Sequence, residues 1–375
     1  MSQFPDDAEW ERPDERFRDV RHSPAPLAGW ILMIGAIAGT VVLGTLPAPY
    51  VLESPGPVYD TIGDIEIAGD TVPVIDIDGE KTYPTSGSLD MLTVTLRGSR
   101  QNPLSWVDLA IAWFDPTRAL LPLDLVYPDG QTEQESDEES AADMADSQKE
   151  AVAAALTELG IDYTSIVVVG STLPGFPAEG VLLAGDRILT VDGDPIDGVT
   201  ELSAALAARP VGSTYAIGIE RDGEKQVVEL TTEASPDKPD MPIIGIQPRA
   251  SYDFPFDVTV NLGDVGGPSA GTMLALGVYD KLTPGELTGG ERIAGTGTIA
   301  ADGRVGAIGG IRQKMYGAKS AGADWFLAPE SNCDEVAGHV PGGLEVFAMS
   351  TLDDALEIVE TIAGGGDTSG LPRCG

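Results

Sequence analysis

The sequence predicts an α+β protein of more than one domain, preceded by an N-terminal transmembrane helix. Residues 27–46 form a run of twenty residues without a charge, which at 1.5 Å per residue is long enough to cross a bilayer core of about 30 Å. Segments rich in Pro, Gly and β-branched residues recur at 49–100 and 165–235, with helical patterns between and after them. A chain of 375 residues exceeds one typical core and predicts two or three domains.

The net charge bears on the class of partner. Sixty acidic residues against 22 basic ones give a formal charge of −38, and such a field repels nucleic acid. We therefore expect no DNA or RNA partner. The acidity fits an extracytoplasmic or salt-adapted surface and by itself indicates no chemistry.

The flanks of the apolar run predict its orientation. Arginines such as Arg12, Arg16 and Arg21 precede it, whereas the first basic residue after it is Lys81. The positive-inside rule then makes residues 1–26 a cytoplasmic tail and residues 27–48 a single-pass membrane anchor, with the remaining chain outside the cell. A cleaved signal peptide is the alternative, but the run is longer than a usual h-region and lacks a good cleavage site. A buried helix is disfavoured because no polar face exists.

Two cysteines, Cys333 and Cys374, allow one disulfide in an extracytoplasmic body. Such a bridge would hold the Gly/Ser-rich C-terminal tail. Two free thiols are the alternative.

Residues 49–160 form an N-terminal extracytoplasmic segment of mixed character. Short strands are expected up to residue 100, and residues 104–114 (LSWVDLAIAWF) predict an apolar helix, either in the core or on the membrane surface. The acidic run 129–143 predicts a solvated loop. A helix is expected to follow it and to end near Gly160.

Residues 161–235 have the pattern of a separate unit. Two short strands surround tight turns, a helix is expected to begin at a Thr200 cap and end before Pro210, and a hairpin is expected to turn at 221–223. With PAEG at 177–180 and LLAGDRILTVDGDPI at 182–196, this unit resembles a PDZ domain of bacterial, protease-associated kind. The resemblance implies a groove that binds an extended peptide. A ligand-free β-rich spacer is the alternative.

One serine raises the question of catalysis. Residues 267–271 (GPSAG) match G-x-S-x-G, the nucleophile elbow of α/β-hydrolases, and His339 lies downstream as that order requires. However, only about 140 residues follow the PDZ-like unit, and an HGGG-type segment is missing. His22 falls in the predicted cytoplasmic tail. A Ser269–His339 esterase is therefore the weaker hypothesis.

A neutral lysine can activate a serine when burial lowers the lysine pKa. Three lysines follow Ser269: Lys281, Lys314 and Lys319. Lys281 is expected at a wet helix end. Lys314 shares a helical stripe with Ile311 and Ala318, as expected for a desolvated base. A lysine with its tip in water is the common alternative.

The segment TGTIAADGRVGAIGGIRQKMYGAKSAGADWFLAPESN, with GGPSAG before it, resembles the proteolytic domain of Lon proteases. The whole architecture is similar to bacterial membrane-anchored Lon-like proteases that carry a PDZ domain. The resemblance implies catalysis by Ser269 and Lys314, with Thr296 helping to orient the lysine. Arg312 occupies the first basic position of the lysine motif. The chain departs from the family pattern at Gly266, which stands where an acidic residue is usual. We assign no third catalytic acid, although Asp264 is nearby.

The resemblance also implies a fold and a mode of action. Residues 236–375 are expected to form a Lon-type proteolytic domain of ribosomal-S5-domain-2-like α/β type, with residues 49–160 as its first half. The PDZ unit would be inserted into this domain or precede it. No G-x-x-x-x-G-K-[ST] phosphate loop occurs in the chain, so we expect proteolysis without ATP and without any cofactor or metal. Protein or peptide substrates are implied, and a homo-oligomeric ring is plausible for this family.

Three functional hypotheses follow. The first is an ATP-independent, membrane-tethered serine endopeptidase. The second is a PDZ scaffold with an inactive protease fold, which would not require both Ser269 and Lys314. The third is the esterase, and a His339→Ala substitution separates it from the first.

Overall fold

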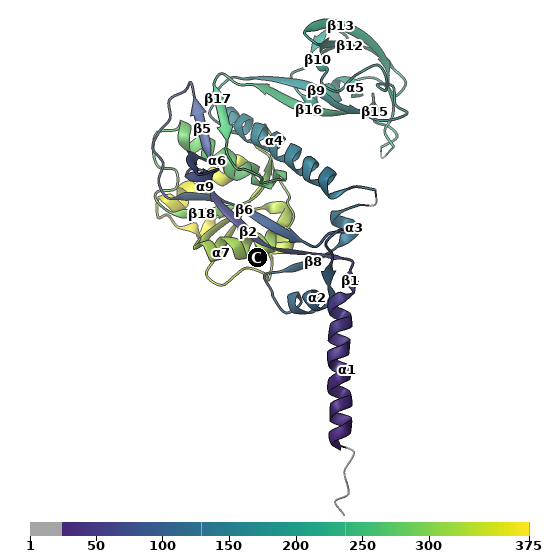
Figure 1. Ribbon diagram of the computed structural model, residues 1–375. Coiled ribbons are helices and arrows are strands. Elements are labelled where there is room, and N and C mark those ends of the chain that lie inside the picture. Colours follow the sequence, from purple (N-terminus) through teal and green to yellow (C-terminus); the bar gives the residue numbers. More distant parts are fainter. Residues whose placement is uncertain (1–24, 129, 237, 375) are drawn as a thin grey trace, which may run out of the picture.

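The structure is a computed structural model that describes residues 25–128, 130–236 and 238–374. The arginines of the predicted tail and His22 lie outside these residues. A long helix, α1 (Ala25–Thr45), projects from a mixed α/β body, and a smaller β-rich unit lies on the far side of that body (Figure 1). Helix α1 coincides with the expected anchor. Within the described part of the chain, no helix combines the length and the apolar character needed to cross a membrane.

The body is organised around a six-stranded sheet with the order β22-β21-β18-β6-β2-β8. Its strands are β2 (Tyr50–Asp60), β6 (Ser88–Arg97), β8 (Ala119–Pro122), β18 (Arg292–Gly295), β21 (Trp325–Pro329) and β22 (Glu345–Met349). Strands β6, β18, β21 and β22 are parallel neighbours, and β2 and β8 add antiparallel strands. Strands from before and after the β-rich unit thus form one sheet, so that unit is an insertion in the body.

Helices cover both faces of this sheet. Leu89 and Met91 on β6 face a core shared with α4 (Glu133–Glu158), α6 (Gly271–Leu282) and α9 (Leu352–Ala363). Leu92 and Ala294 face a second core with α7 (Ile311–Ala321) and α8 (Cys333–Val336). This division follows from the alternation of side chains along a strand. Helices α6 and α7 therefore approach the sheet from opposite sides.

Residues 133–143 of the acidic run are helical and do not form the loop that the sequence predicts. Helix α4 begins at Glu133, where Thr132 and Glu135 form a capping box with reciprocal side-chain bonds to the backbone. Capping satisfies amide groups at the helix start, and acidic side chains are favourable near the positive end of the helix dipole. The charges remain at the surface although the backbone is helical.

Helix α2 (Trp106–Ala112) is only half buried. Leu109 and Ala112 lie in the core, whereas Trp113 is 79% and Phe114 86% exposed. The expectation of a core helix therefore holds for one face alone. The remaining short elements of the body are β1 (Pro47–Ala48), β3 (Asp64–Ile67), β4 (Asp70–Pro73), β5 (Ile75–Asp78), β7 (Leu104–Ser105), α3 (Leu123–Val126), β17 (Asp257–Val260), β19 (Thr298–Ile299), β20 (Val305–Gly306), and the short turns η1 (Pro268–Ala270), η2 (Glu330–Asn332) and η3 (Thr368–Gly370).

The β-rich unit has its own sheet and core. The sheet order is β13-β12-β10-β9-β16, with β11 on β10 and with helix α5 packed against it. Its elements are β9 (Thr164–Thr172), β10 (Arg187–Val191), β11 (Asp194–Pro195), α5 (Val199–Ala207), β12 (Thr214–Arg221), β13 (Glu224–Thr231) and β16 (Ile246–Asp253). The small antiparallel pair β14 (Glu233–Ala234) and β15 (Pro242–Ile243) lies between β13 and β16 in the chain. The hairpin turns at 222–223 as expected.

Two sequence expectations for this unit differ from the structure. The cap of α5 is Gly198 rather than Thr200, which lies inside the helix. The unit also extends beyond residue 235, because β16 pairs with β9 over most of its length. Because a Pro-rich segment separates β16 from the preceding strands in the chain, the sequence did not indicate that β16 belongs to this sheet.

Candidate active site

Ser269 lies in the short turn η1, which continues directly into α6. The preceding Gly267 has φ 82°, a conformation that favours glycine. The Ser147 hydroxyl on α4 donates a hydrogen bond to Pro268 O at 2.9 Å. At Gly271 a Cβ atom would lie 2.9 Å from Ser147 Oγ and from Ile299 Cγ2, so the small residues of this motif allow α4 and α6 to pack closely.

Lys314 reaches the same point from the other side of the sheet. It lies in the first turns of α7 and is only 2% exposed. Its Nζ lies 2.6 Å from Ser269 Oγ and 3.0 Å from Thr296 Oγ1. The lysine predicted to lie on the core-facing stripe is therefore buried with its amine against the serine.

Thr296 follows the last residue of β18 and connects the two groups. Its hydroxyl donates to Ser269 O at 2.9 Å, and the amide of Gly297 donates to the same carbonyl at 2.9 Å. The Thr296 oxygen also lies within hydrogen-bond distance of Lys314 Nζ. The backbone of the serine and the tip of the lysine are thus held by one fully buried threonine.

Burial lowers the pKa of Lys314 from 10.5 to about 8, and the negative charge of Glu53 opposes this shift. Removing an ammonium from water disfavours its charged form. Near neutral pH, far more of Lys314 than of an ordinary lysine is consequently an unprotonated amine, which is the form that can accept a proton from Ser269.

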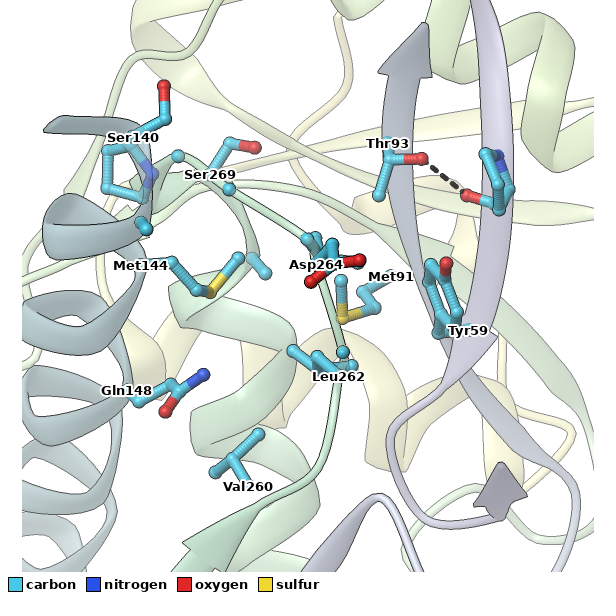
Figure 2. Close-up of a pocket in the computed structure, with 18 of the residues that line it drawn as sticks. Tyr59, Met91, Thr93, Ser140, Met144, Gln148, Val260, Leu262, Asp264 and Ser269 are labelled. Atoms are coloured by element: carbon cyan, nitrogen blue, oxygen red, sulfur yellow. Dashed lines mark hydrogen bonds between the residues drawn. The ribbon is translucent and has the colours of Figure 1, made fainter. Parts of the chain in front are cut away.

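A cleft of about 1580 Å³ opens beside Ser269 and Lys314. In Figure 2, the chain from Val260 to Ser269 runs between side chains of α4 and those of β2 and β6. Met91, Met144 and Leu262 supply apolar surface, and Asp264 lies on the cleft without contacting the lysine in the part of the chain described. The cleft is large enough to hold several residues of an extended peptide.

The remaining predicted residues lie away from this group. His339 is exposed, and its Nδ1 is 3.0 Å from Ala337 O; the described contacts do not connect it with Ser269. Arg312 points to α8, where its Nε donates to Glu335 O. Cys333 and Cys374 are joined by a disulfide. Among the described residues, no group of three or more His, Cys, Asp or Glu side chains could hold a metal ion.

One residue near this site was missed by sequence reasoning. Glu53 on β2 is 7% exposed, and its charge acts on Lys314. A single glutamate in a strand, about 260 residues from the lysine, matches no motif. A buried carboxyl is recognised only once the strands are assembled.

Comparisons with known proteins identify two regions of the chain that match known domain families. The family model of the Lon protease (S16) C-terminal proteolytic domain matches residues 254–361, and a PDZ domain model matches residues 144–232. The chain is 38% identical over 94 residues to the Lon protease of Clostridioides difficile, covering 24% of this chain and 12% of that protein. It is 34% identical over 119 residues to Lon protease 1 of Bacillus subtilis, covering 30% of this chain and 15% of that protein.

The chain thus spans less than a sixth of the length of these two relatives. Among solved structures, the PDZ domain of an SdrC-like protein from Listeria monocytogenes matches with 28% identity and a TM-score of 0.21, covering 22% of this chain and 85% of that chain. The chain contains a Lon-type C-terminal proteolytic domain and a PDZ domain, and both matches support a serine peptidase.

Proposed function

We propose that the protein is an ATP-independent serine endopeptidase in which Ser269 is the nucleophile and Lys314 the general base. The observation that carries this proposal is the 2.6 Å contact between Lys314 Nζ and Ser269 Oγ, made by a lysine that is 2% exposed. A scaffold would gain nothing from burying an amine against a serine, because an unpaired buried cation costs stability. The alternative base, His339, has no such contact in the described part of the chain.

In the proposed reaction, the neutral Lys314 amine takes the proton of Ser269, and Oγ attacks the carbonyl carbon of the scissile peptide bond. The Lys314 ammonium then donates that proton to the leaving amine, which leaves an acyl-enzyme. Lys314 next deprotonates a water molecule, whose oxygen attacks the ester carbonyl of the acyl-enzyme. The bond between that carbon and Ser269 Oγ then breaks, the acid product leaves, and the Lys314 ammonium returns the proton to Oγ. Backbone N–H groups at the start of the turn that continues into α6 would stabilise the oxyanion. Thr296 keeps the amine aligned with Oγ throughout.

ATP independence rests on the sequence. The chain carries no phosphate-loop motif, and phosphate-cradling loops of that type are what couple nucleotide hydrolysis to such enzymes. Substrates would have to enter as flexible or unfolded segments, since an extended peptide fits the cleft.

The PDZ unit would bind peptide segments by strand addition. Strand β16 is the last strand of its sheet, pairing with β9 on one side, and α5 packs near it. An edge strand beside a helix is the arrangement that accepts an extended peptide by main-chain hydrogen bonds. Such binding would bring protein substrates to the body from which the unit projects.

Membrane tethering with an extracytoplasmic body is a separate part of the proposal. It is supported by the uncharged run at 27–46 and by exposed apolar side chains along α1, such as Ile34 at 61% and Val41 at 59%. Trp113 and Phe114, which follow the helix α2 that packs against α1, are also exposed. Aromatic side chains favour the membrane–water interface. A homo-oligomeric ring rests on the family resemblance alone, and sedimentation velocity of the detergent-solubilised chain tests it.

The proposed activity is tested by incubating the full chain, in detergent and without ATP, with an unfolded protein and measuring peptide release. We expect release by the wild type, and none by Ser269→Ala or Lys314→Ala. His339→Ala is the matched control and should retain activity. Activity lost in His339→Ala but kept in Lys314→Ala would replace this proposal with the esterase arrangement. Tight peptide binding with no cleavage by any variant would favour the scaffold.

A further inference from the structure

Glu53 occupies a buried position opposite the start of the helix that carries Lys314. It lies on β2, which packs against α7, and is 7% exposed. A Cβ atom placed on Gly310 would lie 2.5 Å from Glu53 Oε1. Gly310 immediately precedes α7 with φ 70°, and its carbonyl accepts the amide proton of Lys314 at 3.0 Å. The Glu53 carboxyl therefore touches the backbone one helical turn before the lysine.

The direction in which the Lys314 side chain extends brings its amine closer to Glu53 than the backbone positions of the two residues suggest. Side chains on a helix lean toward its N-terminus, so the Lys314 chain runs back toward the end of α7 that Glu53 contacts. Its tip is then fixed by Ser269 and Thr296, which are both uncharged. Because the site is buried and contains less water than the protein surface, the charge of a nearby carboxylate acts strongly on an ammonium there.

The other charged groups around this pair are accounted for within the described residues. Asp90 is a buried carboxylate on β6, the strand next to β2. It is paired with Arg292, whose Nη1 lies 2.9 Å from Asp90 Oδ2. On α8, Glu335 faces Glu53 and raises its pKa after the larger effect of burial, while Arg312 lies 3.9 Å from Glu335. Among the described residues, Glu53 is the negative charge that acts on Lys314 and opposes the lowering of its pKa.

We propose that Glu53 is a positioning residue whose carboxylate stabilises the protonated form of Lys314, and so sets the pH range in which the lysine works as a base. This inference rests on the proposed function, in which Lys314 is the base. Its test follows the titration of Lys314 and does not depend on cleavage. Whenever Ser269 gives up its proton, an ammonium forms in a buried site, and the carboxylate is already in place to stabilise it. Glu53 thereby raises the basicity of Lys314 without touching the substrate.

The variant that tests this inference is Glu53→Gln, which keeps the shape and removes the charge. We expect the Lys314 titration, followed by NMR on the full chain with labelled lysine and assigned with Lys314→Arg, to move to lower pH by about half a unit or more. That shift is roughly a threefold change in proton affinity. The acid limb of kcat/KM should move in the same direction, while the plateau of kcat falls and KM changes little.

Three further variants keep the result interpretable. Glu53→Asp retains the charge and should titrate closer to the wild type than Glu53→Gln does. Glu53→Met also removes the charge and replaces Glu53→Gln if that variant does not fold. Asp90→Asn removes a buried carboxyl on the same side of the sheet and should leave the Lys314 titration unchanged. An unchanged midpoint in Glu53→Gln, or an equal shift in Asp90→Asn, overturns the inference. A shifted midpoint in a chain that cleaves nothing would instead overturn the proposed function and leave the inference intact.

Discussion

Lys314 Nζ lies 2.6 Å from Ser269 Oγ although the two residues belong to helices on opposite faces of one sheet. They meet just beyond the end of β18, where Thr296 bonds to both. Each helix is fixed by its own core, so the distance between the two groups is set by the thickness of the sheet and not by a flexible loop. The dyad is consequently preorganised, as a nucleophile and its base need to be.

Thr296→Val should lower activity while the fold is kept. Valine has nearly the same shape but cannot donate to Ser269 O or bond to Lys314 Nζ. Loss of these contacts should reduce kcat by about tenfold to a hundredfold, as expected for one or two buried hydrogen bonds. Thr296→Ser keeps the hydroxyl and should recover most of the rate. Equal rates for the wild type and Thr296→Val would remove the threonine from the mechanism.

Lys314→Met should stabilise the protein at neutral pH. Burial holds the pKa of Lys314 at about 8 in the folded chain, below 10.5. The unfolded chain therefore binds more protons between these values, and wild-type stability rises as pH increases from 8 to 10.5. Below pH 8 the buried lysine costs roughly 3 kcal/mol, which methionine avoids.

Chemical denaturation of both proteins between pH 6 and pH 11 measures this difference. The advantage of Lys314→Met should be greatest below pH 8 and should shrink as the pH approaches 10.5. An advantage independent of pH would mean that the wild-type lysine is not held at a lowered pKa.

The disulfide should stabilise the C-terminal region of the body. It closes a loop across a sequence separation of 41 residues, for which the chain-entropy account gives an upper value of roughly 4 kcal/mol. The adjoining chain is also held to β22, since Cys374 N donates to Val346 O and Arg373 pairs with Glu345. Reductant should lower the melting temperature of the wild type but not of a Cys333→Ser/Cys374→Ser double variant. Two thiols reacting in the native, unreduced protein would contradict the bridge.

Trp113 should contact lipid when the full chain is reconstituted in vesicles. Its 79% exposure directly after helix α2, which packs against α1, predicts that lipids brominated near the headgroup quench its fluorescence. In a background in which Trp30 and Trp106, which are also exposed on α1 and α2, are replaced by phenylalanine, Trp113→Phe should remove most of the quenched signal. Trp325, on β21 of the body sheet, provides the control, because Trp325→Phe should leave quenching unchanged. Equal quenching in Trp113→Phe would place this surface away from the bilayer.

Short motifs made part of the site predictable. Ser269 and Lys314 stand in small-residue and glycine-rich segments whose residue types suggested a serine–lysine pair, and the role of Thr296 was implied by the resemblance to Lon proteases. The helical stripe also indicated correctly that Lys314 would be buried. These signals are local, and so one sequence suffices for them.

Features that depend on assembly were not predictable. Glu53 acquires its relation to Lys314 only because β2 packs against α7, and β16 joins its sheet across a proline-rich gap. The acidic run 129–143 was a different kind of error. Its charge suggested a loop. However, Thr132 and Glu135, which form the capping box, were visible in the sequence, and a capping box favours the start of a helix despite the charge.

The pH dependence of kcat/KM for peptide cleavage, measured without ATP, tests the central claim most directly. If neutral Lys314 is the base, the rate should rise with pH through about 8, where burial sets the pKa of the amine, and Lys314→Ala should abolish cleavage across the range. A rate that rises only near pH 10, or a profile that survives in Lys314→Ala, would contradict the dyad.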